Sequence, residues 1–274
     1  MSTQNLSVWE KSGSLAEMFW QNGKGDFPIY DMHGHMGTHS AIYMKRCEPA
    51  EMAKHLKRAG VTRLVFSHHE TLWGSRRNVQ DYQVCKEYPD SFRMYLAINP
   101  HFPDHIKEDL AQFDSFRPYA VGLKILADYH QVPVTDPRYQ YAMEFANERK
   151  LPVLFHTWGG SPYNGTKPLL ELIGKYPDAK YFLGHSLYGD WEGAAQCVRA
   201  NENVYLELTA IPGSYGIVEM LCSKVGSTRL LFGTDQPWFD EHQAIGGIVS
   251  ADISEEDMHN ILYRNAQRIL GKDF

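Results

Sequence analysis

The alternation of short apolar segments with longer amphipathic stretches constrains this chain of 274 residues more than any other feature. Eight segments of six or seven residues are rich in β-branched and aromatic residues, which is typical of buried strands. A stretch that can form a helix follows each of them. The predicted strands cover residues 28–33, 63–68, 93–99, 120–126, 151–156, 180–185, 203–209 and 229–235.

The predicted helices cover residues 49–59, 78–88, 103–113, 137–150, 167–176, 191–200, 214–225 and 239–249. Several begin with a proline in the first turn, where the missing N–H costs nothing. Ser254 and Asp257 form a capping-box pattern, which predicts a last helix running to residue 270.

Strands that alternate with helices imply a parallel sheet, and eight such units close into a (β/α)8 barrel of about 250 residues. An open, doubly wound sheet is the alternative. No GxGxxG follows the first segment, however, and polar residues end many segments instead of meeting at one switch point. We therefore predict the α/β class and a single (β/α)8 TIM-barrel domain over residues 1–274, with an N-terminal extension at 1–27 and a C-terminal helix within 254–274.

Charge and composition narrow the partners and the compartment. The formal net charge is −6, which argues against a basic footprint for nucleic acid. No apolar stretch reaches the roughly 20 residues of a membrane span, and the first 20 residues lack a secretory pattern. The four cysteines form no CxxC pair, so we expect free thiols and a cytoplasmic setting.

The strand pattern also predicts which side chains face the barrel axis. In segment 120–126, Val121, Leu123 and Ile125 alternate with residues that include Lys124. In segment 203–209, three apolar residues alternate with residues that include Glu207. Since successive side chains point to opposite faces, we expect the apolar sets to pack against the helices. Lys124 and Glu207 would then face inward.

Polar residues at the ends of the predicted strands suggest a site. His33 and His35, spaced two apart, project from one face of a strand and can reach one ion. His156, His185 and Asp235 end three further strands. Catalytic groups of such barrels lie at the carboxyl ends of the strands. The alternative is that all five residues are hydrogen-bonded structural groups.

Imidazole nitrogens and carboxylate oxygens are ligands for Zn²⁺, and also for Mn²⁺, Fe²⁺ or Co²⁺. We expect one divalent ion, with zinc the first choice. An open coordination position would let the ion lower the pKa of a bound water and supply a nucleophile.

The ordered set DMHGH, VGLKIL, LPVLFHTW, FLGHS, VYLEL, LLFGTDQPW and ILYRNAQRIL resembles the amidohydrolase superfamily. It is most similar to the amidohydrolase-related branch (amidohydrolase 2), which contains lactonases and decarboxylases of the aminocarboxymuconate-semialdehyde type. The resemblance covers nearly the whole chain.

The resemblance implies that His33, His35 and His156 bind the metal, with Asp235 as a further ligand or as the acceptor of a proton from water. It implies that His185 polarises the substrate or moves protons. In other branches the matching histidine binds a second metal beside a carboxylated lysine, so Lys124 leaves a two-metal site open. In the single-metal arrangement, which we favour, Lys124 meets a substrate anion or Glu207.

Two residues after strand ends are candidates for substrate binding. Arg76 could clamp a carboxylate through its guanidinium, and Trp158 could form an apolar wall. The alternative for both is that they are ordinary loop residues. His68, His69 and Asn99 are weaker candidates, and we take His39 as a non-ligand.

Taken together, these features predict a metal-dependent hydrolase that cleaves a C–O or C–N bond of a small carboxylated substrate, such as a lactone or amide. Asp235 would accept the proton and His185 would stabilise the oxyanion. The alternative reaction is non-oxidative decarboxylation of an aromatic or muconate-like acid. A non-catalytic scaffold is the remaining alternative. We expect a homo-oligomer with no nucleic-acid or membrane partner.

Overall fold

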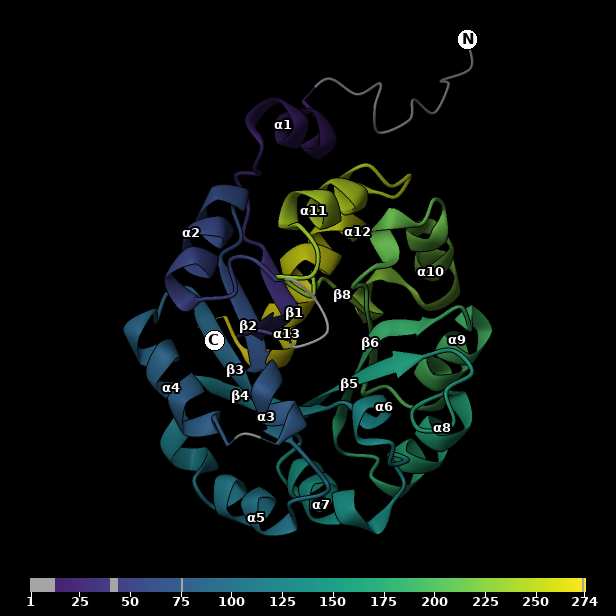
Figure 1. Cartoon of the computed structure of the whole chain (residues 1–274). Helices are drawn as coiled ribbons and strands as arrows, with labels where there is room; N and C mark the ends of the chain where they lie inside the picture. Colours follow the sequence, from purple (N-terminus) through teal and green to yellow (C-terminus); the bar gives the residue numbers. More distant parts are fainter. Residues whose placement is uncertain (1–12, 40–43, 75, 273) are drawn as a thin grey trace.

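The computed structural model describes residues 13–39, 44–74, 76–272 and 274, and in it eight parallel strands lie in sequence order around a barrel (Figure 1). The strands are β1 (Tyr30–Met36), β2 (Arg63–His68), β3 (Phe92–Ile98), β4 (Ala120–Ile125), β5 (Pro152–Trp158), β6 (Lys180–Tyr188), β7 (Val204–Glu207) and β8 (Leu230–Leu231). The prediction for β2 matches in both bounds. Three other strands, β1, β5 and β6, extend beyond their predicted carboxyl ends.

Backbone hydrogen bonds between β1 and the segment after β8 bring the first and last strands together. Met32 N donates to Phe232 O, and Asp235 N donates to His33 O at 2.7 Å. Gly34 forms a parallel bridge with Gln236. The prediction of a (β/α)8 barrel is therefore confirmed.

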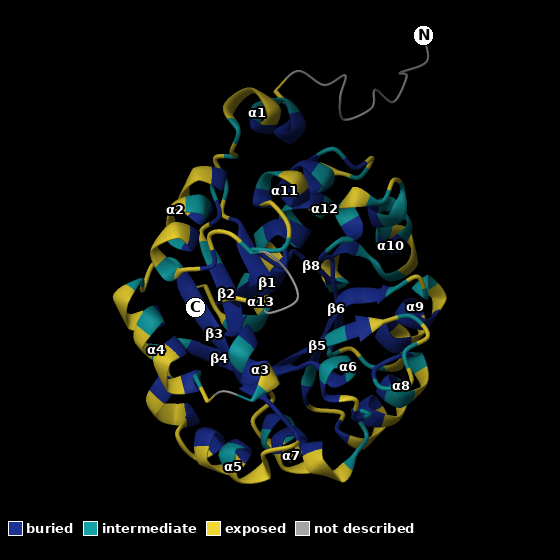
Figure 2. Cartoon of the chain, in the orientation of Figure 1, coloured by how far each residue is buried: buried dark blue, intermediate teal, exposed yellow. Residues whose placement is uncertain are grey.

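Helices surround the barrel, with buried inner faces and exposed outer faces (Figure 2). The helices are α1 (Leu15–Asn22), α2 (Pro49–Ala59), α3 (His69–Trp73), α4 (Asn78–Glu87), α5 (Pro103–Ala111), α6 (Ala127–His130), α7 (Gln140–Glu148), α8 (Thr166–Lys175), α9 (Trp191–Ala200), α10 (Ile217–Val225), α11 (Glu241–Val249), α12 (Glu255–His259) and α13 (Asn265–Leu270). The predictions for α2 and α9 match in both bounds. The helices α1, α3 and α6 were not predicted.

The barrel interior is filled by apolar side chains from all eight strands. They form one buried cluster: Tyr30, Met32, Val65, Tyr95, Val121, Leu154, Phe182, Tyr205 and Leu231, closed by Ala266 and Phe274. The prediction that Val121 packs outward is wrong. The β3–β4 register shifts between Met94 and Tyr95, where Ala120 and Gly122 are the successive partners, and this places Val121 inside while Leu123 and Ile125 pack outside.

The C-terminal helix forms as its capping box predicts. Ser254 and Asp257 bond reciprocally at the start of α12, and a π-helical turn over Asn260–Arg264 joins α12 to α13. Within the predicted N-terminal extension, α1 contacts the end of α11 and the start of α12, because Trp20 Nε1 donates to Ser250 Oγ at 3.1 Å and Leu15 N donates to Glu255 Oε1 at 3.2 Å. The division of the chain at residues 27 and 254 stays a prediction.

The structure bears on two expectations from composition. All four cysteines carry free thiols. In the described ranges, no helix combines the length and the apolar character that crossing a membrane requires.

Candidate metal centre

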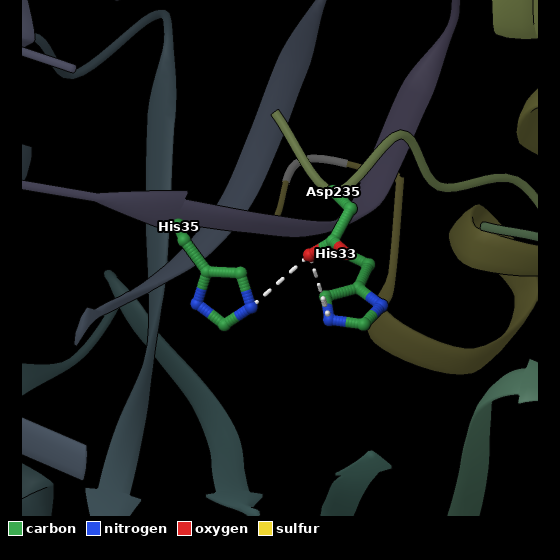
Figure 3. A group of neighbouring side chains, drawn as sticks. All are labelled: His33, His35 and Asp235. Atoms are coloured by element: carbon green, nitrogen blue, oxygen red, sulfur yellow. Dashed lines mark ion pairs between the residues drawn. The ribbon is translucent and has the colours of Figure 1, made fainter. Parts of the chain in front are cut away.

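Three side chains from β1 and the segment after β8 converge at the carboxyl end of the barrel. Ligand atoms of His33, His35 and Asp235 all lie within 4.8 Å of one another, and all three residues are buried. Asp235 Oδ1 lies 3.5 Å from His33 Nε2 and 3.1 Å from His35 Nε2 (Figure 3). The structure thus brings together three of the four predicted metal ligands.

Asp31 holds β1 and the segment after β8 together through buried hydrogen bonds. Its Oδ1 accepts from the backbone N–H groups of His33 and Thr234, at 3.1 and 3.0 Å, and its Oδ2 accepts from Thr234 Oγ1. Because one carboxylate joins β1 to the residue before Asp235, it sets His33 and Asp235 side by side. Burial raises the pKa of Asp31 well above its usual range.

A buried chain of hydrogen bonds selects the tautomer of His33. Lys124 Nζ lies 2.7 Å from His33 Nε2, and a lysine ammonium only donates. His33 Nε2 is therefore unprotonated, and the ring proton is on Nδ1. That N–H donates to Glu207 Oε2 at 2.7 Å.

Glu207 is held in turn by Thr209, whose N–H and Oγ1 both donate to Glu207 Oε1 at 2.7 Å. Burial raises the pKa of Glu207 to about 8, and the two bonds from Thr209 act in the opposite sense. Only glycine fits at position 233, because a Cβ there would lie 2.0 Å from Glu207 Oε1. Lys124 and Glu207 both face inward, as the strand pattern predicts, and burial lowers the pKa of Lys124 to about 8.

The donor set fits a divalent ion. Burial lowers the pKa values of His33 and His35 well below their usual range, so both rings are neutral. Burial opposes ionisation of Asp235, but neighbouring groups led by His33 and His185 outweigh it and lower its pKa. His33 Nε2, His35 Nε2 and the Asp235 carboxylate lie close together, and a cation bound among them would take the place that the Lys124 ammonium now holds at His33 Nε2. Asp235 Oδ1 is buried and has no hydrogen-bond donor among the described residues.

His185 lies beside these groups on an unusual backbone. Its ring centroid is 5.1 Å from that of His33, and its Nε2 is 3.9 Å from Asp235 Oδ2. His185, Ser186 and Leu187 have φ angles of 62°, 53° and 53°, in the left-handed region that non-glycine residues rarely occupy. Ser186 Oγ donates to Glu207 O, and Leu187 N donates to Thr157 Oγ1, which holds the turn in place. Such strain is concentrated at functional sites.

His156, the fourth predicted ligand, lies nearby but outside the three-residue group. Its ring is 4.6 Å from that of His185, and its Nε2 lies 3.8 Å from Asp128 Oδ2. Asp128 is fixed by Ser161 Oγ and Asn164 Nδ2, each at 2.6 Å. Burial lowers the pKa of His156 to about 4. The ligand role of His156 stays a prediction.

The two predicted substrate residues lie in different surroundings. The Trp158 ring is 42% exposed, stacks on Tyr188 with centroids 4.8 Å apart, and meets the His185 ring at 5.8 Å. It can therefore form a wall beside the site. Arg76, in contrast, donates to Asp109 Oδ1 at 2.8 Å and pairs with Glu108, both on α5. The structure does not bring Arg76 to the histidines.

Several residues near the site were missed or given little weight from the sequence. Asp128 and Tyr129 lie on α6, a helix of four residues without an amphipathic repeat. His69 stacks on His35 with ring centroids 4.2 Å apart, and its only sequence signal was a position just after a strand. Asn99 is structural, because its side chain bonds the backbone of Leu72 and His101.

Comparison with known proteins adds a family and a set of similar folds. The family model described as amidohydrolase matches residues 15–272. No functionally curated protein matches the sequence.

Three solved structures represent the folds that are similar. A 2,6-dihydroxybenzoate decarboxylase with bound 2,6-dihydroxybenzoate has 15% identity and a TM-score of 0.76, over 90% of this chain and 99% of that one. The 5-carboxyvanillate decarboxylase of Sphingomonas paucimobilis has 14% identity and a TM-score of 0.70, over 89% and 98%. That of Novosphingobium aromaticivorans, crystallised with manganese, has 13% identity and a TM-score of 0.68, over 89% and 96%. At these identities the likeness establishes the fold.

Proposed function

This chain belongs to the amidohydrolase family and is an enzyme, and from that premise we propose that it is a metal-dependent decarboxylase of a small aromatic acid. The proposal reverses the order of the two reactions expected from the sequence, in which hydrolysis came first. Three structures with the same fold are those of decarboxylases of hydroxylated benzoates, and this supports the change.

The observation that carries the proposal is the convergence of His33, His35 and Asp235 beside flat aromatic rings. Trp158 stacks on Tyr188 at one side of the site, and Trp73 stacks on Tyr129 with centroids 4.5 Å apart. The outer faces of such stacked rings are apolar surfaces on which a planar substrate can pack. The buried cation of Lys124 balances the acidic groups and favours an anionic ligand.

His33 Nε2, His35 Nε2 and Asp235 Oδ1 would hold one divalent ion, and His156 is the further predicted ligand. Zinc is the ion expected from the ligand types, and a neighbouring fold crystallised with manganese supports manganese equally. A bound ion would supply positive charge to a carboxylate or phenolate oxygen of the substrate.

In the proposed reaction the bond between the ring carbon and the carboxylate carbon breaks, and carbon dioxide leaves. The electron pair stays on the ring carbon, which takes a proton. Solvent supplies that proton, since Asp235 is ionised, and His185 Nε2, 3.9 Å from Asp235 Oδ2, is placed to pass it to the ring carbon.

Substrate panels distinguish decarboxylation from hydrolysis. Protein loaded with zinc or manganese is offered 2,6-dihydroxybenzoate and 5-carboxyvanillate in one panel, and lactones and amides in another. We expect carbon dioxide release and about one metal ion per chain. Hydrolysis of a lactone or amide without carbon dioxide release would overturn the proposal, and two ions per chain would restore a carboxylated Lys124.

The variant His185→Asn tests the assignment of the proton donor. We expect kcat to fall at least 100-fold, with metal content unchanged, because His185 is not placed among the metal-binding atoms. Loss of the metal together with activity would instead make His185 a ligand.

A further inference from the structure

His69 presents a buried hydrogen-bond donor beside the candidate metal centre. It is the first residue of α3, directly after β2, and is only 1% exposed. Its ring lies nearly parallel to that of His35, with an interplanar angle of 13° and centroids 4.2 Å apart. The ring is therefore fixed against one of the proposed metal ligands.

Trp238 determines which nitrogen of His69 carries the proton. The indole Nε1 of Trp238 donates to His69 Nε2 at 3.3 Å. An indole N–H can only donate, so His69 Nε2 is unprotonated and the ring proton lies on Nδ1. This indole lies three residues after Asp235, so the same segment supplies a metal-binding carboxylate and the group that orients His69.

The Nδ1–H of His69 is buried and finds no hydrogen-bond acceptor in the part of the chain that the structure describes. Buried polar groups are nearly always paired, so an unpaired one in a native protein calls for an explanation such as a catalytic role or a bound water or ion. The neighbouring His68 shows the contrast, because its Nδ1 accepts from Glu70 N and completes a helix cap.

We infer that His69 is a substrate-contact residue whose Nδ1–H donates to an anionic oxygen of the substrate, and that Trp238 is the positioning residue that fixes its tautomer. The inference rests on the proposed function, since it supposes an anionic aromatic substrate at this site. The substrate would therefore place one of its anionic oxygens next to His69, on the side of the site formed by β1 and β2. A carboxylate or an ortho-phenolate oxygen meets that requirement.

The tautomer can be observed without turnover. In metal-loaded protein with ¹⁵N-labelled histidine, we expect the His69 resonances of a neutral ring protonated at Nδ1. Addition of 2,6-dihydroxybenzoate should shift the Nδ1–H signal downfield. In Trp238→Phe, which keeps an apolar ring but removes the donor, we expect the second tautomer to become populated. An Nε2–H ring in the wild type, or a signal that 2,6-dihydroxybenzoate leaves unmoved, overturns the inference.

Two amide substitutions separate the two ring positions. The side-chain nitrogen of asparagine lies as far from Cα as Nδ1, and that of glutamine lies as far as Nε2. We expect His69→Gln to lower kcat/KM about 100-fold and His69→Asn about 5-fold. His105→Gln, on α5 where the ring stacks on Phe102, is the matched control and keeps the wild-type value. Equal losses in the two His69 variants overturn the inference.

The two proposals fail in different ways. If no benzoate releases carbon dioxide while the Nδ1–H signal still responds to 2,6-dihydroxybenzoate, the reaction is wrong and the role of His69 stands. If carbon dioxide is released and the two amide variants are equally impaired, the reaction stands and the role of His69 falls.

Discussion

At the scale of single residues, Glu207 Oε2 accepts a hydrogen bond from His33 Nδ1. This bond keeps His33 Nε2 unprotonated, as metal binding requires. Both donors of Thr209 occupy Glu207 Oε1, so an amide at position 207 would turn its oxygen to Thr209 and its NH₂ group to His33 Nδ1. His33 would then carry its proton on Nε2, where the metal would bind. We expect Glu207→Gln to weaken metal affinity 10- to 100-fold, measured by chelator competition.

Glu171→Gln is the control for this substitution, because Glu171 is an exposed residue of α8. Unchanged metal affinity in Glu207→Gln would show that Glu207 does not set the tautomer of His33.

Lys124 contacts Nε2 of His33, the nitrogen that would bind the metal. The single lone pair of Nε2 cannot accept from Lys124 Nζ, 2.7 Å away, and bind a metal at the same time. We therefore expect Lys124→Met to bind the metal about tenfold more tightly, since both a competitor and a repelling charge are removed. Turnover should fall at least tenfold, because the cation that balances the substrate anion is gone.

Isothermal titration calorimetry on metal-free protein gives the affinity of this variant, and Lys57→Met on α2 is the control. Weaker metal binding in Lys124→Met would contradict the competition and favour a carboxylated lysine as a bridging ligand.

How far the site could be predicted depended on the kind of contact. His33 and His35 could be found because residues two apart on a strand share a face, and Asp235 because it ends a strand. Asp128 could not be found, since its approach to His156 depends on the path of the chain after β4. Arg76 was proposed from its loop position, but the acidic residues of α5 that pair with it lie over 30 positions later.

At the scale of elements, the end of α7 shows a conformation that the sequence does not favour. Lys150 has a φ of 53°, and Leu151 N donates to Ala146 O at 2.9 Å, which is the pattern of a left-handed helix cap. Glycine adopts this conformation without steric cost. We expect Lys150→Gly to raise the free energy of unfolding by about 0.5–1 kcal/mol in urea denaturation.

Lys175→Gly is the matched variant with the opposite expectation. Lys175 is an exposed residue in the last turn of α8, where its backbone is helical. Glycine there should lower the free energy of unfolding by up to about 1 kcal/mol. Equal effects of the two substitutions would show that the left-handed cap is not strained.

The errors in element prediction have local physical causes. Hydrophobic pattern located the strands because a barrel strand is buried on both faces. Pattern could not detect the register shift in β4, since no residue type marks it, and so Val121 was placed on the wrong face. The regular strand β8 has only two residues because the chain then follows β1 through single backbone bonds and a left-handed Asp235.

At the scale of the whole molecule, apolar side chains fill the interior of the barrel, and the polar residues of the candidate site lie at the carboxyl end of the strands. Apolar side chains from every strand fill the interior, so the polar layer above them rests on a rigid floor. The site residues come from strand ends and loops above this floor, with His33 and His35 both on β1, so a substitution among them leaves the floor intact. The homo-oligomer and the cytoplasmic setting stay predictions.

Several histidines are buried, so we expect the free energy of unfolding to decrease at acid pH. Burial lowers the pKa of His130 to about 4, whereas a histidine in the unfolded chain titrates near 6.5. Between those values the unfolded chain binds a proton that the folded chain refuses, so stability is lost as the pH falls from 6.5 towards 4. His68, whose pKa is also lowered to about 4 by burial, acts in the same direction. Asp81 acts in the opposite direction, because burial raises its pKa to about 8 and the folded carboxyl keeps its proton where the unfolded one ionises.

Two substitutions separate these contributions in metal-free protein. His130→Gln keeps a donor for Leu72 O, which His130 Nε2 bonds at 2.8 Å, but removes the titrating ring. Its free energy of unfolding should rise less steeply between pH 5 and 6.5 than that of the wild type, by about 1 kcal/mol per pH unit. Asp81→Asn should make the rise steeper, since the opposing carboxyl is gone. Urea denaturation at several pH values measures both slopes, and equal slopes in all three proteins would mean that neither group titrates differently on folding. The slopes are compared rather than the absolute stabilities, because each substitution also removes packing that does not depend on pH.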